Sequence, residues 1–382
     1  MLLGVATSLG LLALGWASAL AKDLVFETAT AIKSGESIFL LGTDECLGSD
    51  DVTQAVMLAP QGDGKWGGKI RLAAGTTGTY RYLKRKTGAE EFEDPANVVF
   101  VGKPRVMPEV EGGRKIEARE VKGKGKLEIP KYLGSPIKEF PGRMIRVWLP
   151  PGYEGGKERY PVVYCHDGQN IFDPGGPFGS WSADKIAEEE MRSGRVRPAI
   201  LVGIDNTPDR VREYLPPADV VPAGRPAEGE EGRADLYSRY LLEVVKPYVD
   251  RTYRTLPAKE DTLVLGSSMG GVVSHYLLEK HGDVFGAAGV FSPAYWACPR
   301  FYAQSLKKPK PDGRTYLDMG TREGRSYWPD VIRIYQHWVK SGAVIRGDLW
   351  FQPGIRAEHS ERAWRERLPA ALRFLLPPEK EN

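Results

Sequence analysis

Hydrophobic and polar positions follow two patterns along this chain, one in its N-terminal part and another in the rest. Within residues 23–102, short runs that alternate between apolar and polar residues are separated by turn residues. Such alternation is typical of half-buried strands, and no helix-length apolar period interrupts it. Residues 23–102 therefore predict a small all-β sandwich domain, and the charged, glycine-rich residues 103–126 predict a linker. The clearest strand patterns are Ser37–Gly42, Trp66–Leu72 and Thr79–Lys84.

From residue 127 onward, apolar runs rich in β-branched residues alternate with helical patterns. Strands that alternate with helices are the signature of an α/β domain with a mostly parallel sheet, and we expect such a domain over residues 127–378. The predicted strands are 143–149, 161–165, 199–204, 262–265, 287–291, 316–319 and 348–351. The predicted helices include 183–192, 234–248, 272–280, 330–340 and 361–376.

The N-terminal segment has the composition of an export signal. Residues 2–21 carry no charge, and Ala19-Leu20-Ala21 precedes Lys22. This small-x-small pattern is typical of a signal-peptidase site, so residues 1–21 are predicted to be a signal peptide and the protein to be secreted or periplasmic. The segment is also about long enough to span a membrane, and an uncleaved anchor is the alternative. We expect no other membrane contact.

The charges of the chain are nearly balanced, with 53 Lys and Arg against 50 Asp and Glu, and no block of like charge occurs. The charge balance itself argues neither for nor against nucleic acid, and in the absence of a basic patch we expect no nucleic-acid partner. The three cysteines, Cys46, Cys165 and Cys298, lack the spacing of metal ligands and indicate no disulfide framework. Because the sequence also lacks a dinucleotide-binding fingerprint, we expect neither a metal nor another cofactor.

The most informative motif is Gly266-Ser267-Ser268-Met269-Gly270, which lies between a predicted strand and a predicted helix. A strand, Gly-x-Ser-x-Gly and a helix in this order form the nucleophile elbow of α/β-hydrolases. The serine occupies a strained turn that exposes its hydroxyl, and the glycines let the strand and the helix pass close together. Ser268 is therefore the candidate nucleophile, and the second domain is predicted to have the α/β-hydrolase fold.

A serine nucleophile needs a base, and the chain has five histidines. In this fold the triad follows the order serine, acid, histidine. That order and their placement exclude His166, His275 and His281, and His337 lies inside a helical pattern. His359 follows the last predicted strand, in a loop from which a side chain can reach the elbow, and it is the predicted base.

The acid that orients the base is expected at the end of the preceding strand, 316–319. Glu323 lies three residues past the glycine that follows this strand, whereas Asp318 lies within the strand pattern. We favour Glu323 because a loop position can face His359, and Asp318 stays open as the alternative.

A tetrahedral intermediate also needs an oxyanion hole. One donor is expected to be the backbone N–H of Met269, directly after the nucleophile. The second is expected to be the backbone N–H of Gln169, because Gly168 permits an unusual turn after strand 161–165. The residues expected to line the substrate pocket are Trp181, Asn206, Arg210, Tyr214 and Trp296.

Five motifs occur in order along the second domain: His166–Asp173, Gly266–Gly271, Ser292–Trp296, Gly320–Glu323, and Glu358-His359 followed by Trp364. Together they resemble the putative esterase family, which contains enterochelin esterases, family 1 carbohydrate esterases and mycolyltransferases. The resemblance covers roughly residues 127–376. It implies that Ser268 is the nucleophile, His359 the base, and Glu323 the acid, a position where many relatives carry aspartate. It also implies that the backbone N–H of Gln169 donates a hydrogen bond in the oxyanion hole.

The first domain contains, in order, the segments Glu36–Gly42, Leu47-Gly48, Trp66, Ala73–Gly75 and Tyr80–Tyr82. With these segments it resembles a starch-binding module, carbohydrate-binding family 20. It departs from that family where Asp50 and Phe92 stand at or near the positions of sugar-stacking tryptophans. Stacking on an aromatic face is what holds a glucan, so we favour a structural or lid role for this domain. Weak glucan contact is the alternative.

Three functions are consistent with these patterns. The favoured one is a secreted serine esterase that acts, through an acyl-enzyme, on an ester linked to a carbohydrate, a polyphenol or a siderophore. The second is an acyltransferase that passes the acyl group to an alcohol, and release of free acid without added alcohol would separate the two. The third is a non-catalytic carbohydrate-binding protein, against which the complete triad argues.

Overall fold

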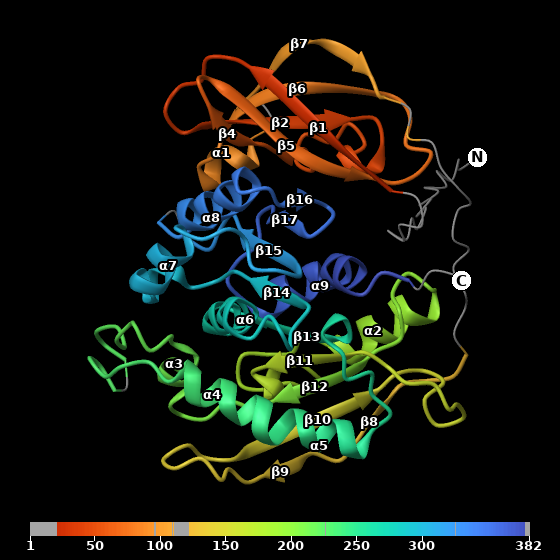
Figure 1. The fold of residues 1–382 in the computed structure, drawn as a ribbon, viewed down its shortest axis with the longest axis vertical. Helices are drawn as coiled ribbons and strands as arrows, with labels where there is room; N and C mark the ends of the chain where they lie inside the picture. Colours follow the sequence, from red (N-terminus) through yellow and green to blue (C-terminus); the bar gives the residue numbers. More distant parts are fainter. Residues whose placement is uncertain are drawn as a thin grey trace, which may run out of the picture.

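The computed structural model describes residues 21–94, 97–108, 110, 122–225, 227–324 and 326–378. The predicted signal peptide, apart from its last residue, and residues 109 and 111–121 of the predicted linker lie outside the described residues. The β-rich N-terminal part lies at one end of an elongated molecule, and the α/β part extends away from it (Figure 1). No helix of the described part is both long enough and apolar enough to cross a bilayer.

A thirteen-stranded sheet runs through the whole molecule, with the central strand order β16-β17-β15-β14-β13-β11-β12-β10. All neighbours from β16 to β12 are parallel, whereas β12 and β10 are antiparallel. This arrangement confirms the predicted mostly parallel sheet. The strands of the α/β part are β8 (Lys126–Leu127), β9 (Lys131–Leu133), β10 (Arg143–Leu149), β11 (Val162–His166), β12 (Ile200–Ile204), β13 (Thr262–Ser267), β14 (Ala287–Phe291), β15 (Arg314–Gly320), β16 (Val344–Ile345) and β17 (Leu349–Gly354).

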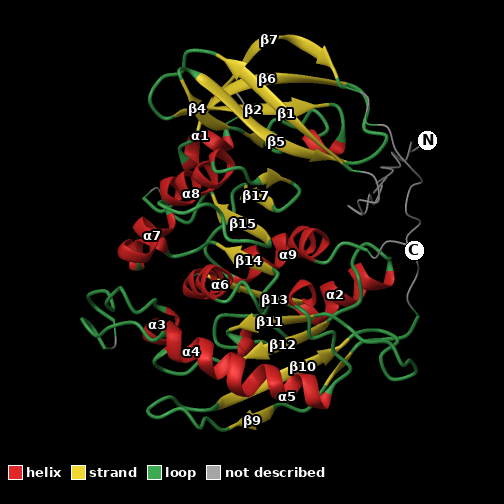
Figure 2. Ribbon diagram, in the orientation of Figure 1, coloured by secondary structure: helices red, strands yellow, loops and turns green. Residues whose placement is uncertain are grey.

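Helices cover both faces of this sheet (Figure 2). Side chains alternate between the faces along each strand, so Val163 and Cys165 of β11 pack in the core beneath α2 and α9, while Val162 and Tyr164 pack in the core on the opposite face. The predicted helix 234–248 is one continuous element of α4, a π-helical turn (Leu241–Val245) and α5. The helices of the α/β part are α2 (Ala183–Arg192), α3 (Arg210–Tyr214), α4 (Ala234–Tyr240), α5 (Lys246–Thr252), α6 (Met269–Lys280), α7 (Pro299–Ser305), α8 (Trp328–Lys340) and α9 (Glu361–Leu375).

The N-terminal part packs a four-stranded sheet, of order β3-β2-β6-β7, against β1, β5 and β4. The ring of Phe26 on β1 contacts that of Tyr80 on β6 at 5.1 Å between centroids, which places the two layers face to face. The N-terminal part also contains a five-residue helix, α1, which is too short to show a helical period of apolar residues in the sequence. The strands are β1 (Lys22–Ala29), β2 (Glu36–Gly42), β3 (Val56–Met57), β4 (Ala59–Gly62), β5 (Lys65–Leu72), β6 (Thr79–Lys86) and β7 (Val98–Val106), and α1 is Ala89–Glu93.

The two parts share one sheet and one core. Strand β5 pairs in parallel with the two-residue strand β16, through Lys69 with Val344 and Ile70 with Ile345. The ring of Phe92 in α1 lies 5.4 Å from that of Trp328, the first residue of α8. The sequence predicted the sandwich but not the pairing of β5 with β16, because the two residues of β16 are too few to show an alternating pattern.

Candidate active site

Ser268 lies on a sharp turn between β13 and α6, at the carboxyl edge of the sheet. Its backbone dihedral angles are φ 60° and ψ −120°, a conformation that is strained for a residue with a side chain. The flanking glycines make the turn feasible. A Cβ atom at Gly266 would lie 2.9 Å from the His166 ring, and one at Gly271 would lie 2.7 Å from the Phe291 carbonyl oxygen. The motif therefore forms the predicted elbow.

His359 and Glu323 meet between the loops that follow β17 and β15. The Nδ1 atom of His359 lies 2.7 Å from Oε2 of Glu323. The glutamate side chain is fully buried, and the imidazole is 42% exposed. With Nδ1–H as the donor to Glu323, the other ring nitrogen of His359 remains as an acceptor. This is the arrangement of a base and its orienting acid.

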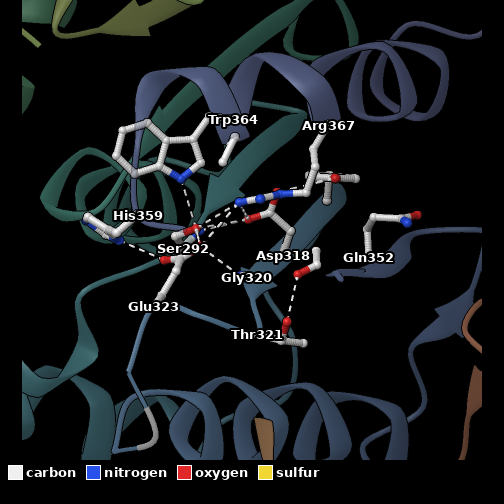
Figure 3. A network of polar contacts seen from close by, with 12 residues as sticks. Ser292, Asp318, Gly320, Thr321, Glu323, Gln352, His359, Trp364 and Arg367 are labelled. Atoms are coloured by element: carbon white, nitrogen blue, oxygen red, sulfur yellow. Dashed lines mark hydrogen bonds and ion pairs between the residues drawn. The ribbon is translucent and has the colours of Figure 1, made fainter. Parts of the chain in front are cut away.

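The second carboxylate oxygen of Glu323 is held in place by a polar network (Figure 3). Oε1 accepts hydrogen bonds from the Ser292 hydroxyl and the Gly320 N–H, each at 2.7 Å. The Trp364 indole N–H in turn donates to Ser292 Oγ at 2.9 Å, and its ring contacts the His359 ring edge to face at 4.9 Å. The carboxylate therefore has a fixed orientation.

Asp318, the alternative acid, lies behind this network and is fully buried. It pairs with Arg367 at 2.7 Å and accepts the Ser292 N–H at 2.8 Å. Burial raises the pKa of Asp318, and Arg367 opposes that rise. The structure thus brings Glu323, and not Asp318, to His359. Sequence reasoning missed Arg367 altogether, and it singled out Ser292 only within a motif.

The turn after β11 holds the second predicted oxyanion donor. Asp167 has the left-handed dihedral angles φ 57° and ψ 48° and begins the short 3₁₀ helix Gly168–Asn170. A side chain at Gly168 would collide with the Gly203 backbone at 2.5 Å. Gln169 in this helix and Met269 at the start of α6 occupy first-turn positions, where backbone N–H groups have no carbonyl partner within the helix.

A cluster of charged and polar side chains fixes this turn. Arg210 donates to both carboxylate oxygens of Asp167, at 2.6 and 2.8 Å, and the Asn206 side-chain amide donates to it at 2.6 Å. Although burial opposes the effect, Arg210 lowers the pKa of Asp167, which stays ionised at neutral pH. Arg210 and Asn206 were expected to bind substrate. In the structure they hold the turn at Asp167 in place.

These elements surround one cavity of about 390 Å³. Ser268, Met269 and His359 line it, together with four of the five residues predicted for the pocket, Trp181, Asn206, Arg210 and Trp296. The cavity is also lined by residues that the sequence analysis did not assign to the pocket, among them Asn170, Phe178, Val211, Arg225, Glu361 and Trp364. The aromatic side chains make much of the wall apolar.

Tyr214 is a correction to the predicted pocket. It is fully buried, and its hydroxyl accepts the Asp167 N–H at 3.2 Å. Its ring contacts Tyr237 and His166. It lies on the same side of α3 as Arg210 but one helical turn farther along, where it contacts the turn at Asp167 and does not line the cavity.

Two of the remaining histidines, His166 and His275, are buried. His166 also borders the cavity, but burial lowers its pKa to about 3, and its Nδ1 atom lies 2.7 Å from the Tyr237 hydroxyl. Burial likewise lowers the pKa of His275 to about 4. Within the described ranges, no three His, Cys, Asp or Glu side chains are grouped to hold a metal ion, and the three cysteines are buried and free.

The positions expected for sugar-stacking tryptophans lack a platform. Phe92 is 1% exposed and packs between Phe39 and Trp328 in the shared core. Asp50 is exposed on a left-handed turn and lines a hollow of about 220 Å³ together with Tyr80. Phe92, the aromatic residue at one of these positions, is therefore part of the core and offers no surface for stacking a sugar.

The two parts of the chain match two different protein families. Residues 142–375 match the family described as "Putative esterase". Residues 23–103 match the family described as "Starch binding domain". These matches agree with the resemblances predicted from the motifs.

Individual relatives are distant. The chain is 24% identical over 213 residues to the uncharacterized protein YbbA of Bacillus subtilis, which covers 54% of this chain and 78% of YbbA. It is 23% identical over 193 residues to an endo-1,4-beta-xylanase/feruloyl esterase of Xylanibacter ruminicola, which covers 48% of this chain but only 24% of that protein. The crystal structure of an IroE-like serine hydrolase from Shewanella oneidensis has a TM-score of 0.55 at 20% identity, over 66% of this chain and 80% of the other. That likeness shows the α/β-hydrolase fold.

Proposed function

We propose that this chain, which belongs to the family described as "Putative esterase", is a serine esterase that cleaves carboxylic esters through a Ser268–His359–Glu323 triad. One observation carries the proposal. The strained serine and the imidazole border the same cavity, and the imidazole is bound at 2.7 Å to a buried carboxylate.

In this mechanism the Ser268 hydroxyl oxygen adds to the ester carbonyl carbon while its proton passes to His359. Glu323 holds the imidazole in the productive orientation and stabilises its positive charge. The resulting oxyanion accepts hydrogen bonds from the backbone N–H groups of Gln169 and Met269. The bond to the leaving alkoxide then breaks, His359 returns the proton to that oxygen, and an acyl-enzyme remains.

The second half-reaction uses water. His359 takes a proton from the water, whose oxygen attacks the acyl carbon. The bond between that carbon and Ser268 Oγ then breaks, His359 returns the proton to Oγ, and the acid is released. If an alcohol replaces water, the same site acts as an acyltransferase. Release of free acid without added alcohol distinguishes the two reactions.

The proposed substrates are esters linked to a carbohydrate, a polyphenol or a siderophore. The cavity supports this class because aromatic side chains of Phe178, Trp181, Trp296 and Trp364 line it, and flat rings pack well on such walls. The name of the xylanase/feruloyl esterase relative points in the same direction. We also propose that the protein is exported, on the basis of its uncharged residues 2–21.

The test is a panel of p-nitrophenyl, feruloyl and acetyl-xylan esters with the purified protein. We expect turnover of at least one ester and its loss in Ser268→Ala and His359→Ala. His337→Ala is the matched control, because this half-buried histidine contacts the Lys308 carbonyl oxygen and does not line the cavity. Full activity of Ser268→Ala would refute the triad.

A further inference from the structure

The last residue of α1, Glu93, reaches out of the N-terminal part to two loops of the α/β part. Its Oε1 atom accepts a hydrogen bond from the Thr321 hydroxyl at 2.5 Å. The Arg322 guanidinium donates to both carboxylate oxygens, at 3.3 Å each. Arg356 completes the cluster, with Nε 3.9 Å from Oε2. One carboxylate of the first domain therefore contacts three side chains of the second.

These three side chains belong to the loops that carry the proposed acid and base. Thr321 and Arg322 lie directly before Glu323 in the loop after β15, and Arg356 lies three residues before His359 in the loop after β17. Strands β15 and β17 pair as far as Gly320 with Gly354, so beyond these residues the relative position of the two irregular loops depends on the hydrogen bonds between them.

Thr321 is the link between the loops. Its hydroxyl oxygen accepts the Arg356 N–H at 2.8 Å, and of the two acceptors for its proton Glu93, at 2.5 Å, is nearer than the Gly354 carbonyl oxygen, at 3.3 Å. A hydroxyl has one proton and can rotate, so an acceptor for that proton fixes the direction in which its lone pairs point. The Arg322 N–H also donates to the Ala357 carbonyl at 3.0 Å. Glu93 thereby holds the geometry of a junction that joins the two loops.

The charge of Glu93 suits this role. Its side chain is 17% exposed. Although burial opposes the effect, the hydrogen bonds from Thr321 and Arg322 lower its pKa, so the carboxylate is ionised at neutral pH. Two arginines face it, and without the carboxylate they would repel each other across the loop junction.

We propose that Glu93 is a positioning residue, by which the N-terminal part sets the distance between Glu323 and His359. This inference rests on the proposed triad. It assigns to the N-terminal part a role in catalysis that needs no sugar. Glu93 itself does not line the cavity, so its effect should fall on turnover and not on substrate binding.

The experiment compares Glu93→Asp, Glu93→Gln and Glu93→Ala with the wild type in the full chain, with Glu91→Gln of the same helix as the control. We expect kcat to fall in the order Asp, Gln, Ala, by about tenfold in Glu93→Ala, with KM unchanged within about twofold. Glu91→Gln should keep wild-type values. Thr321→Val should lower kcat similarly, and its combination with Glu93→Gln should cost little more, because both remove one linkage.

A spectroscopic signal separates positioning from general stability. The His359 Nδ1 proton, which is bonded to Glu323, should give a low-field proton NMR resonance that weakens or broadens in Glu93→Gln. This signal does not depend on turnover. If Glu93→Gln lowers Tm but leaves both kcat and the resonance unchanged, Glu93 is an ion-pair partner only, and the inference is wrong. Retained activity in Ser268→Ala would instead refute the triad itself, whatever Glu93 does.

Discussion

Replacing Arg367 with Met tests the polar network behind the proposed acid. The side chain is nearly buried, and its guanidinium pairs with Asp318 at 2.7 Å and with Glu323 at 3.4 Å. Met has a similar length but no charge, so Arg367→Met leaves two buried carboxylates without their cation. Removing one partner of a buried ion pair typically costs about 3–5 kcal/mol. For a domain of about 250 residues, this loss of free energy corresponds to a decrease in Tm of roughly 6–20 °C.

The loss should depend on pH in a defined direction. Burial raises the pKa of Asp318, and Arg367 opposes that rise, so the folded pKa in Arg367→Met should lie higher still. A carboxyl that binds its proton more tightly when folded favours folding at low pH, and this contribution is lost as the pH rises through its folded pKa. The deficit of Arg367→Met relative to the wild type should therefore be largest near about pH 8 and smaller near about pH 5.

Urea denaturation at both pH values measures these differences as free energies of unfolding. Asp318→Asn in the Arg367→Met background serves as the second arm, because it removes the unpaired charge and should recover much of the loss at pH 8. The reasoning fails if Arg367→Met loses less than about 1 kcal/mol, or if its deficit is the same at both pH values and Asp318→Asn does not reduce it.

Four further outcomes are expected. Ser268→Ala and His359→Ala should each lower kcat for a p-nitrophenyl ester by roughly 10⁴-fold or more, and the double variant should lose little beyond that. Glu323→Ala should cost about 10- to 1000-fold in kcat, and a larger loss in a folded Asp318→Asn would show that the acid is assigned wrongly. The full chain should not be retained on amylose or β-cyclodextrin resin, since its Phe92 is buried; clear retention, competed by free maltose, would establish a true glucan site. The difference in Tm between the wild type and Glu93→Gln should be present above about pH 4.5 and disappear as the pH falls further, because the folded pKa of Glu93 is lowered; an unchanged difference at low pH would contradict an ionic role.

Local patterns predicted the elements that a short stretch of chain can specify. The strand, elbow and helix around Ser268 lie within about twenty consecutive residues, and the structure forms them as expected. Chain order, together with placement in loops after predicted strands, selected His359 and favoured Glu323, and the structure places these two side chains together. Their catalytic roles stay predictions until the variants are measured.

The contacts between distant segments could not be predicted. Arg367 and Glu93 act through partners 44 to 49 and 228 to 229 residues away, and no spacing in the sequence marks such pairs. Tyr214 was expected in the pocket, but it lies one helical turn beyond Arg210 and packs against Tyr237 and the turn at Asp167, contacts that no sequence spacing marks. Phe92 shows the same limit, since its burial depends on α8, far along the chain.

The pairing of β5 with β16 means that a boundary between two sequence families is not a boundary in the folding of this protein. Cutting the chain after residue 103 would leave β16 with a free edge, and free edges of sheets are sites of aggregation. It would also uncover the Trp328 and Tyr335 side chains, both of which are buried against the N-terminal part. The starch-binding-like segment thus cannot be exchanged as a cassette, and both halves should unfold in one cooperative transition on heating.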